Sequence, residues 1–259
     1  MNTNKKRLFE GKNKGGTGGG DGDSSAFNGQ RPITRQTPGI IGFNPDALTV
    51  IEFLENTFYP AVPPAVTLTV NDPVREIGQT VAYTLTWAVV RKSNNITGIT
   101  VDGTAKAPTG GDQSGTQNGN LAATTGTYTK SMSATDGTLT GNASATVTYL
   151  PRMFWGTTTK NGGSSPITDA DILALAGSKL ATERDLTLSN FGGGAAYLVF
   201  AFPSSFGTPS FVVNGLANTA FTKVRSASNF VNAQGATIVM DVWISNNFYN
   251  SALDSVIIN

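Results

Sequence analysis

Two pairs of aspartates are the residues of this sequence best suited to chemistry. Asp169 and Asp171 stand in "TDAD", and Asp21 and Asp23 stand in "GGDGD". Carboxylate oxygens at this spacing can hold a hard cation such as Ca²⁺, but neither pair fits the pattern of an EF-hand loop. The first pair also opens a predicted helix, where the helix dipole stabilises negative side chains. We therefore interpret Asp169 and Asp171 as capping residues and predict no metal site.

The chain contains no histidine and no cysteine. It therefore cannot form a Ser–His catalytic pair, a thiolate nucleophile or a cysteine-ligated metal site. The glycine-rich "GGTGGGDGD" lacks the Gly-Lys-Ser/Thr ending of a phosphate-binding loop and follows no predicted strand. We expect no catalytic residues, no bound cofactor and no enzymatic activity. The rival interpretation is a polysaccharide hydrolase, which would need paired carboxylates in a cleft.

Residues 1–36 differ in composition from the rest of the chain. They hold seven basic and three acidic residues, a balance of +4 in a chain whose total is +1, together with eight glycines. Such a segment buries too little apolar surface to offset the entropy of ordering, so we predict a flexible arm. The arm either docks in a groove on a partner or remains a solvated tail. Docking would use its first five basic residues, Lys5, Lys6, Arg7, Lys12 and Lys14.

Residues 37–61 form a predicted junction that contains one short helix. In "TVIEFLENTFYP", apolar side chains recur every four residues at Val50, Leu54 and Phe58, and a proline ends the pattern. So short a helix is marginal alone, so its apolar face must pack on another surface. It either caps the following domain or packs against copies of itself around a symmetry axis. The second option makes these three residues attachment residues of a homo-oligomer, with a trimer as the leading case.

Residues 62–151 alternate in polarity as the strands of a sandwich do. One face of "VAYTLTWAVV" carries large apolar residues: Val81, Tyr83, Leu85, Trp87 and Val89. Further strands are predicted in "AVTLTV", "ITGITVDG", "GTYTKSMSATDG" and "NASATVTYL", and "TGGDQSGTQNGN" is predicted to be a turn-rich connection. Several short strands with a large aromatic on a central one predict an immunoglobulin-like β-sandwich without the disulfide of antibody domains.

Residues 152–259 are predicted to be a second β-rich domain with one helix. The helix lies in "SSPITDADILALAGSKLA", where Thr168 is the expected N-cap and Ile172 and Leu175 face inward. Strands are expected in "AAYLVFAFPSSFGTPSFVVNG", "ATIVMDVWIS" and "SVIIN", which are apolar runs bounded by Gly, Pro and Asn. The whole chain is therefore predicted to be mostly β, preceded by the arm and the short helix.

Neither nucleic acid nor a membrane is predicted as a partner. Beyond the arm, basic residues are scattered, and Tyr83, Trp87 and Trp243 alternate along strands as core residues do, not as a stacking platform does. No apolar run approaches the roughly 20 residues that a membrane-spanning helix needs. We expect no specific nucleic-acid binding and no membrane insertion.

A set of segments in this order resembles virion structural proteins of tailed bacteriophages. These segments are "TVIEFLENTFYP", "VREIGQTVAYTLTWAVV", "TVTYLPRMFWGTT", "ITDADILALAGSKLA" and "YLVFAFPSSFGTPSFVVNG". In that group a segment like "FLENTFYP" leads into an immunoglobulin-like domain that opens like "REIGQTV", and a segment like "RMFWG" opens a distal β-domain. The resemblance covers roughly residues 37–259 and leaves the arm out.

The resemblance implies an oligomeric adaptor, or a head, neck or tail fibre component, located in the virion. Its expected partners are other virion proteins of the capsid, the portal and neck, or the tail. The arm and the short helix would attach the chain, and the two β-domains would project outward. The alternative is a receptor- or carbohydrate-binding module of a phage fibre, which would meet a host surface through aromatics at loop tips: Trp155, Phe206 and Phe248.

Overall fold

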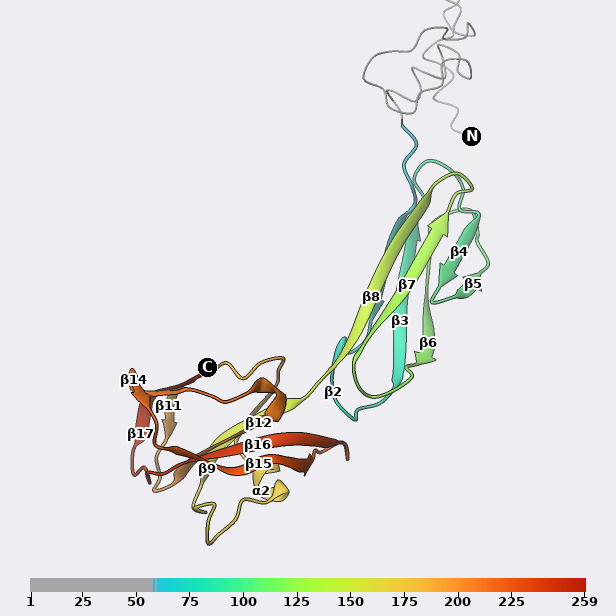
Figure 1. Ribbon diagram of the computed structural model, residues 1–259. Helices are drawn as coiled ribbons and strands as arrows, with labels where there is room; N and C mark the ends of the chain where they lie inside the picture. Colours follow the sequence, from blue (N-terminus) through green and yellow to red (C-terminus); the bar gives the residue numbers. More distant parts are fainter. Residues whose placement is uncertain (1–57, 59) are drawn as a thin grey trace, which may run out of the picture. The chain divides into compact units, whose positions relative to one another are not determined.

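The computed structural model describes Phe58 and residues 60–259, and the chain is mostly β, as predicted (Figure 1). Residues 62–259 form one compact unit. Within it, the strands before Pro151 pair with one another, and the strands after it do the same. No helix in the described part of the chain has the length and apolar character that crossing a membrane requires.

The first β-domain is a sandwich of two sheets with immunoglobulin-like connections. One sheet has the order β1-β3-β6 and the other β2-β8-β7-β4-β5. The chain switches sheets between β3 and β4 and again between β5 and β6, which is a Greek-key arrangement. The strands are β1 (Ala65–Val70), β2 (Val74–Glu76), β3 (Ala82–Val90), β4 (Gly98–Val101), β5 (Thr104–Lys106), β6 (Gln113–Asn120), β7 (Thr127–Thr135) and β8 (Thr140–Leu150).

The core of this sandwich follows the alternation of β3. Tyr83, Leu85, Trp87 and Val89 are all buried, which confirms the predicted inner face. They pack on apolar residues of the opposite sheet, among them Ile99, Val101, Met132 and Val147.

A buried arginine holds the loops around β2 and β3. Arg75 is only 1 % exposed, and its guanidinium donates to four main-chain carbonyls, those of Asn71, Asp72, Thr80 and Ala82, at 2.7–3.2 Å. Bonds to a charged donor are stronger than bonds between neutral groups, so this arginine fixes the path of the chain around it.

Strand β6 contradicts the prediction that "TGGDQSGTQNGN" is a turn. It pairs with β3 along its whole length, with Trp87 opposite Gly115 and Tyr83 opposite Gly119. A Cβ on Gly115 would lie 2.8 Å from the Trp87 ring, and a Cβ on Gly119 would collide with the Tyr83 ring. The two glycines therefore accommodate the two aromatic rings, and this packing overrides the low strand propensity of the segment.

The second β-domain contains a five-stranded sheet, β10-β9-β12-β16-β15, and a four-stranded sheet, β11-β17-β13-β14. Its elements are β9 (Arg152–Thr158), α2 (Asp169–Leu173), β10 (Gly177–Leu180), β11 (Leu186–Gly192), β12 (Tyr197–Pro203), the 3-10 helix η3 (Ser204–Phe206), β13 (Phe211–Val213), β14 (Leu216–Asn218), β15 (Phe221–Val231), β16 (Thr237–Ser245) and β17 (Ala252–Ile258).

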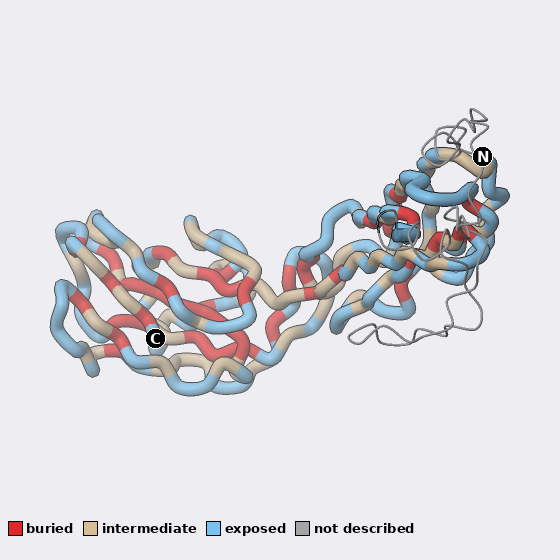
Figure 2. Tube along the Cα trace, turned by 90° about the horizontal axis from the view of Figure 1, so that it is seen from above, coloured by how far each residue is buried: buried red, intermediate tan, exposed pale blue. Residues whose placement is uncertain are grey.

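The five-stranded sheet of this domain is covered on both faces. On β12, Leu198, Phe200 and Phe202 pack toward the four-stranded sheet, while Val199 and Ala201 join the cluster that includes Ile172 of α2. Burial on both sides explains why β12 is a continuous apolar run and not an alternating one. In Figure 2, buried stretches in red run through the domain that holds the C-terminus.

Helix α2 begins as predicted but ends early. Thr168 is the N-cap and forms a capping box with Asp171, and Ile172 is fully buried. The predicted helix does not continue through "GSKL", because this segment is strand β10 and pairs with β9. Gly177 lies opposite Trp155 in that pair and leaves room for the indole ring.

Only Pro151 separates β8 from β9, and side chains tie the two β-domains together beside it. Arg152 Nε donates to the Glu76 carboxylate at 3.1 Å, and Glu76 is 5 % exposed. Asn232, between β15 and β16, donates to the Glu76 carboxylate at 3.3 Å and to the Ile77 carbonyl at 2.7 Å. These bonds link β2 of the first domain to β9 and to the β15–β16 turn of the second.

Candidate binding surface

The outer face of the β1-β3-β6 sheet carries hydroxyl and amide side chains in register. Thr69, Thr86 and Thr116 form one row across the three strands, and Thr84 and Asn118 form part of the next. We call this surface the amide face, and its residues are Thr67, Thr69, Thr84, Thr86, Ser114, Thr116, Asn118 and Asn120. None of these eight residues carries a charge, and all are exposed except Thr84, which is partly buried.

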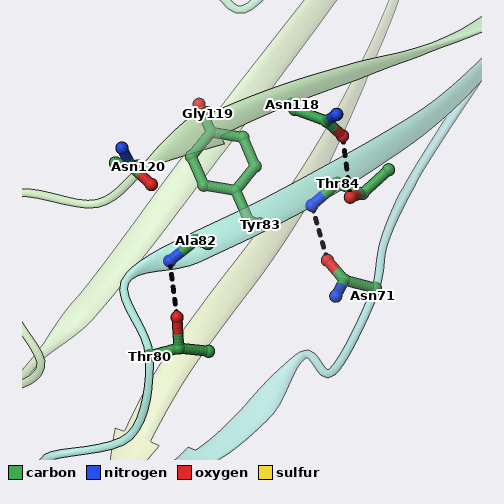
Figure 3. Close-up of a pocket in the computed structure, with 8 residues that line it drawn as sticks. All are labelled: Asn71, Thr80, Ala82, Tyr83, Thr84, Asn118, Gly119 and Asn120. Carbon is green, nitrogen blue, oxygen red and sulfur yellow. Dashed lines mark hydrogen bonds between the residues drawn. The ribbon is translucent and has the colours of Figure 1, made fainter.

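A shallow depression of about 580 Å³ lies at one end of the amide face (Figure 3). Its lining combines the ends of β3 and β6 with the loops around β2: Asn71, Thr80, Ala82, Tyr83, Thr84, Asn118, Gly119 and Asn120. Every side chain in this set is neutral at pH 7, so the depression presents hydrogen-bonding groups without a net charge.

Hydrogen bonds hold several of these polar groups in place. The Asn71 side-chain carbonyl accepts from the Thr84 main-chain N–H at 2.6 Å, and the Thr84 hydroxyl donates to Asn118 Oδ1 at 2.8 Å. Thr80 Oγ1 accepts from the Ala82 main-chain N–H at 3.1 Å. Figure 3 shows these three bonds as dashed lines. The bond to Thr84 uses only the oxygen of the Asn118 amide, so the two Nδ2 hydrogens are left for a ligand.

A partly buried polar cluster lies next to the depression. The Tyr83 hydroxyl donates to Asp102 Oδ2, Lys130 Nζ lies 3.1 Å from the same carboxylate, and the Lys130 ammonium stands 4.6 Å from the centre of the Tyr83 ring. Burial and the hydrogen bond with Asp102 raise the pKa of Tyr83 above its ordinary value. Burial alone would lower the pKa of Lys130, but hydrogen bonds with Tyr83 and Asp102 raise it.

This arrangement suits recognition and not proton transfer. The one titratable group in the lining is the Tyr83 phenol, and its raised pKa keeps it protonated near neutral pH. The amides and hydroxyls of the lining can donate to and accept from a neutral polar ligand. Comparisons with known proteins add nothing to this chemistry. No protein-family model, no curated protein and no solved structure matches the chain.

The aromatic residues predicted for receptor contact occupy three different environments. Trp155 on β9 and Phe206 in η3 are partly buried against the same core cluster. Phe248 is 45 % exposed and packs edge-on against Tyr197, with ring centroids 5.1 Å apart. Of the three, Phe248 presents the largest share of its side chain to solvent.

The predicted attachment residues lie almost entirely outside the described part of the chain. Seven of them lie outside the described residues, and their role in attachment remains a prediction: Lys5, Lys6, Arg7, Lys12, Lys14, Val50 and Leu54. Phe58 is described and is 68 % exposed.

The aspartates at the start of α2 form ion pairs. Asp171 bonds to Lys160 Nζ at 2.7 Å, and Asp169 bonds to Arg225 at 2.6 Å and to the Val231 main-chain N–H at 3.0 Å. Of the two predicted capping residues, Asp171 makes the capping box, whereas the bonds of Asp169 tie the helix to β15. Among the described residues, no three acidic side chains gather as metal ligands.

The amide face was missed at the sequence level because β6 was predicted to be a turn. One signal was available in the spacing. The aromatics Tyr83 and Trp87 are four residues apart, and so are the glycines Gly115 and Gly119. Two antiparallel strands can place such pairs opposite each other. Two aromatics and two glycines at the same spacing therefore indicate that their strands are neighbours in the sheet.

Proposed function

We propose that this chain is a non-enzymatic structural component of a bacteriophage virion, in the head, the neck or a tail fibre or adaptor. The observation that carries the proposal is the junction between the β-domains. One proline separates their strands, and Arg152 and Asn232 bond to buried Glu76 across the boundary. Bonds of this kind couple the second domain to the first, and a projecting spacer needs such coupling. The resemblance of residues 37–259 to tailed-phage virion proteins supports the same function.

In this proposal, the arm and the short helix attach the chain to another virion protein, and the two β-domains project outward. The basic residues of the arm would meet an acidic groove, and its glycines would let the main chain follow a narrow channel.

Incorporation into particles tests the attachment. Deleting residues 1–36 should abolish incorporation while leaving the circular dichroism spectrum of the β-domains unchanged. A charge reversal at Lys5 and Lys6 should reduce incorporation, and the matched reversal at the exposed Arg91 and Lys92 should not. Normal incorporation of the truncated chain would assign attachment to another part of the protein.

The second candidate is a carbohydrate- or receptor-binding module, and the depression on the amide face favours it. Asparagine amides and threonine hydroxyls can bond to sugar hydroxyls, and the lining has no charge that would select an ionic ligand. A screen against neutral glycans, with the double variant Asn118→Ala and Asn120→Ala, tests this surface. Thr67→Ala on the same face is the matched control. Binding that is lost with Phe248→Ala or Trp155→Ala, and not with the double variant, would move the site to the second domain.

A further inference from the structure

Strand β6 is an edge strand with an open hydrogen-bonding side. It pairs with β3 on one side and ends the sheet on the other. The Leu121 main-chain N–H donates to the Val81 carbonyl at 2.9 Å, and this bond shows which residues of β6 point their main-chain groups toward β3. Because the bonding direction alternates along an antiparallel strand, the odd-numbered residues of β6 bond to β3. The main-chain N–H and carbonyl groups of Ser114, Thr116, Asn118 and Asn120 therefore face the open side.

The other edge strands in the described part of the chain are protected. Strands β2, β5 and β14 have three residues each, and β10 has four. Strand β15 carries Lys223 and Arg225 at two register shifts. In strand β11 the pairing with β17 skips Asn190, which has a φ of 49°. Strand β1 follows the pair Pro63–Pro64. Short length, charge, irregularity and proline are the features that discourage edge pairing.

Strand β6 has none of these protections. It is eight residues long, its register with β3 shows no shift, and it contains no proline and no charged residue. An edge with these properties is a template for another strand.

We propose that β6 pairs with β6 of a second copy of this chain, antiparallel and about a two-fold axis at Gln117. A two-fold axis sets a strand against itself in reverse, so any charge on it would meet like charge nearby. Strand β6 is neutral and avoids this repulsion. The register that covers the whole strand pairs Ser114 with the second copy's Asn120 and Thr116 with the second copy's Asn118. In this register the open N–H and carbonyl groups of both copies face one another.

An unpartnered atom lies at the proposed axis. Gln117 Oε1 is buried and has no hydrogen-bond partner among the described residues, while its Nε2 donates to Thr104 Oγ1 at 3.3 Å. A side-chain amide nitrogen has two donor hydrogens, so one remains for a second bond. In the proposed register the two Gln117 side chains are direct neighbours in a pair without main-chain bonds, where side chains approach most closely. Because Oε1 is inaccessible in the single chain, each Gln117 side chain must turn toward the axis on pairing, and the second copy's Gln117 then supplies the donor that Oε1 lacks.

The pairing is a different interface from the attachment through residues 1–58, and it stands whether or not the chain belongs to a virion. It joins two β1-β3-β6 sheets into one sheet. If copies of the chain also assemble through the short helix, the β6 pairing doubles the number of copies in that assembly.

Light scattering on the full chain tests the pairing. Thr116→Lys places a charge on the open edge, and Thr116→Pro removes an open N–H without removing a bond to β3. Both variants should halve the mass of the wild-type assembly. The matched control is Thr86→Lys, which carries the same charge one strand away in the same row of the sheet. It should keep the wild-type mass, and urea unfolding should show that the two lysine variants are equally folded.

Disulfide cross-linking tests the register. The chain has no cysteine, so a single introduced cysteine is its only thiol. Gln117→Cys should form a covalent dimer on oxidation, because facing residues in such a pair have Cα atoms close enough for a disulfide. Gln113→Cys, on the same face of the same strand, should not, because it faces Leu121 of the second copy. Equal cross-linking of the two variants, or equal masses for wild type and Thr116→Lys at every concentration, would overturn the proposal.

Discussion

Adding one methyl group at Gly115 should destabilise the first β-domain only while Trp87 is present. A Cβ at this position would lie 2.8 Å from Trp87 Cζ2 and 3.1 Å from Cε2, where ordinary contacts begin at 3.4 Å. The ring or the strand must therefore move, and such overpacking costs about 1–3 kcal/mol. The main-chain φ of Gly115 lies outside the left-handed region, so alanine adds no conformational strain of its own.

In a Trp87→Leu background the same Gly115→Ala change should be neutral or slightly stabilising. The indole is gone, and alanine reduces the entropy of the unfolded chain, which is worth about 0.4–1 kcal/mol. The coupling free energy between the two positions should then be about 1–3 kcal/mol. Gly111→Ala is the matched control, because a Cβ there meets no atom within 4 Å.

Urea unfolding followed by far-UV circular dichroism measures the four free energies of this cycle. In the Trp87→Leu background, tryptophan fluorescence comes only from Trp155 and Trp243, so it reports the second β-domain separately. The same cost for Gly115→Ala in both backgrounds would refute the argument that the indole requires a glycine opposite it.

Three further predictions concern stability. Trp87→Ala should cost about 3–5 kcal/mol because it leaves a cavity in the core, and differential scanning calorimetry should show the transition of the second β-domain in place. Arg152→Ala should cost about 1–3 kcal/mol by leaving the buried Glu76 carboxylate without its cation, which urea unfolding measures against the exposed Arg91→Ala. A lysine ammonium and the capping hydrogen bonds lower the pKa of Asp171 to about 2, below its unfolded value of about 3.9, so its contribution is complete above about pH 4 and is lost as the pH falls toward 2. Unfolding free energies measured over this range should fall less steeply for Asp171→Asn.

Local alternation was sufficient to predict β3 and its buried face. Tyr83, Leu85 and Trp87 recur every second residue, and a strand with one inner face is the only regular element that buries them together. The capping pattern at Thr168 likewise fixed the start of α2, because the residues that make the cap are adjacent in the sequence. In both places the determining interactions are local.

Elements that depend on distant partners were the ones that sequence reasoning missed. Strand β6 is rich in Gly, Asn and Gln, and it is a strand because Trp87 and Tyr83 lie opposite its glycines. The end of α2 is set by the pairing of "GSKL" with β9, more than 20 residues upstream in the sequence. The amide face could not be predicted for the same reason, because half of it lies on β6.

The pairing of β2 with β8 gives the first β-domain a mechanical property. These strands are parallel, with Val74 opposite Thr148 and Glu76 opposite Leu150, and they lie near the two ends of the domain's chain. A pull on the chain from both ends would load the β1–β3 pairs first and, once these open, would slide β2 along β8, loading their hydrogen bonds together in shear instead of opening them one at a time. Tension would then pass through Pro151 directly into β9, which has a neighbouring strand on each side in the next sheet. The domain should accordingly bear tension along its chain better than an antiparallel hairpin peeled from its open end.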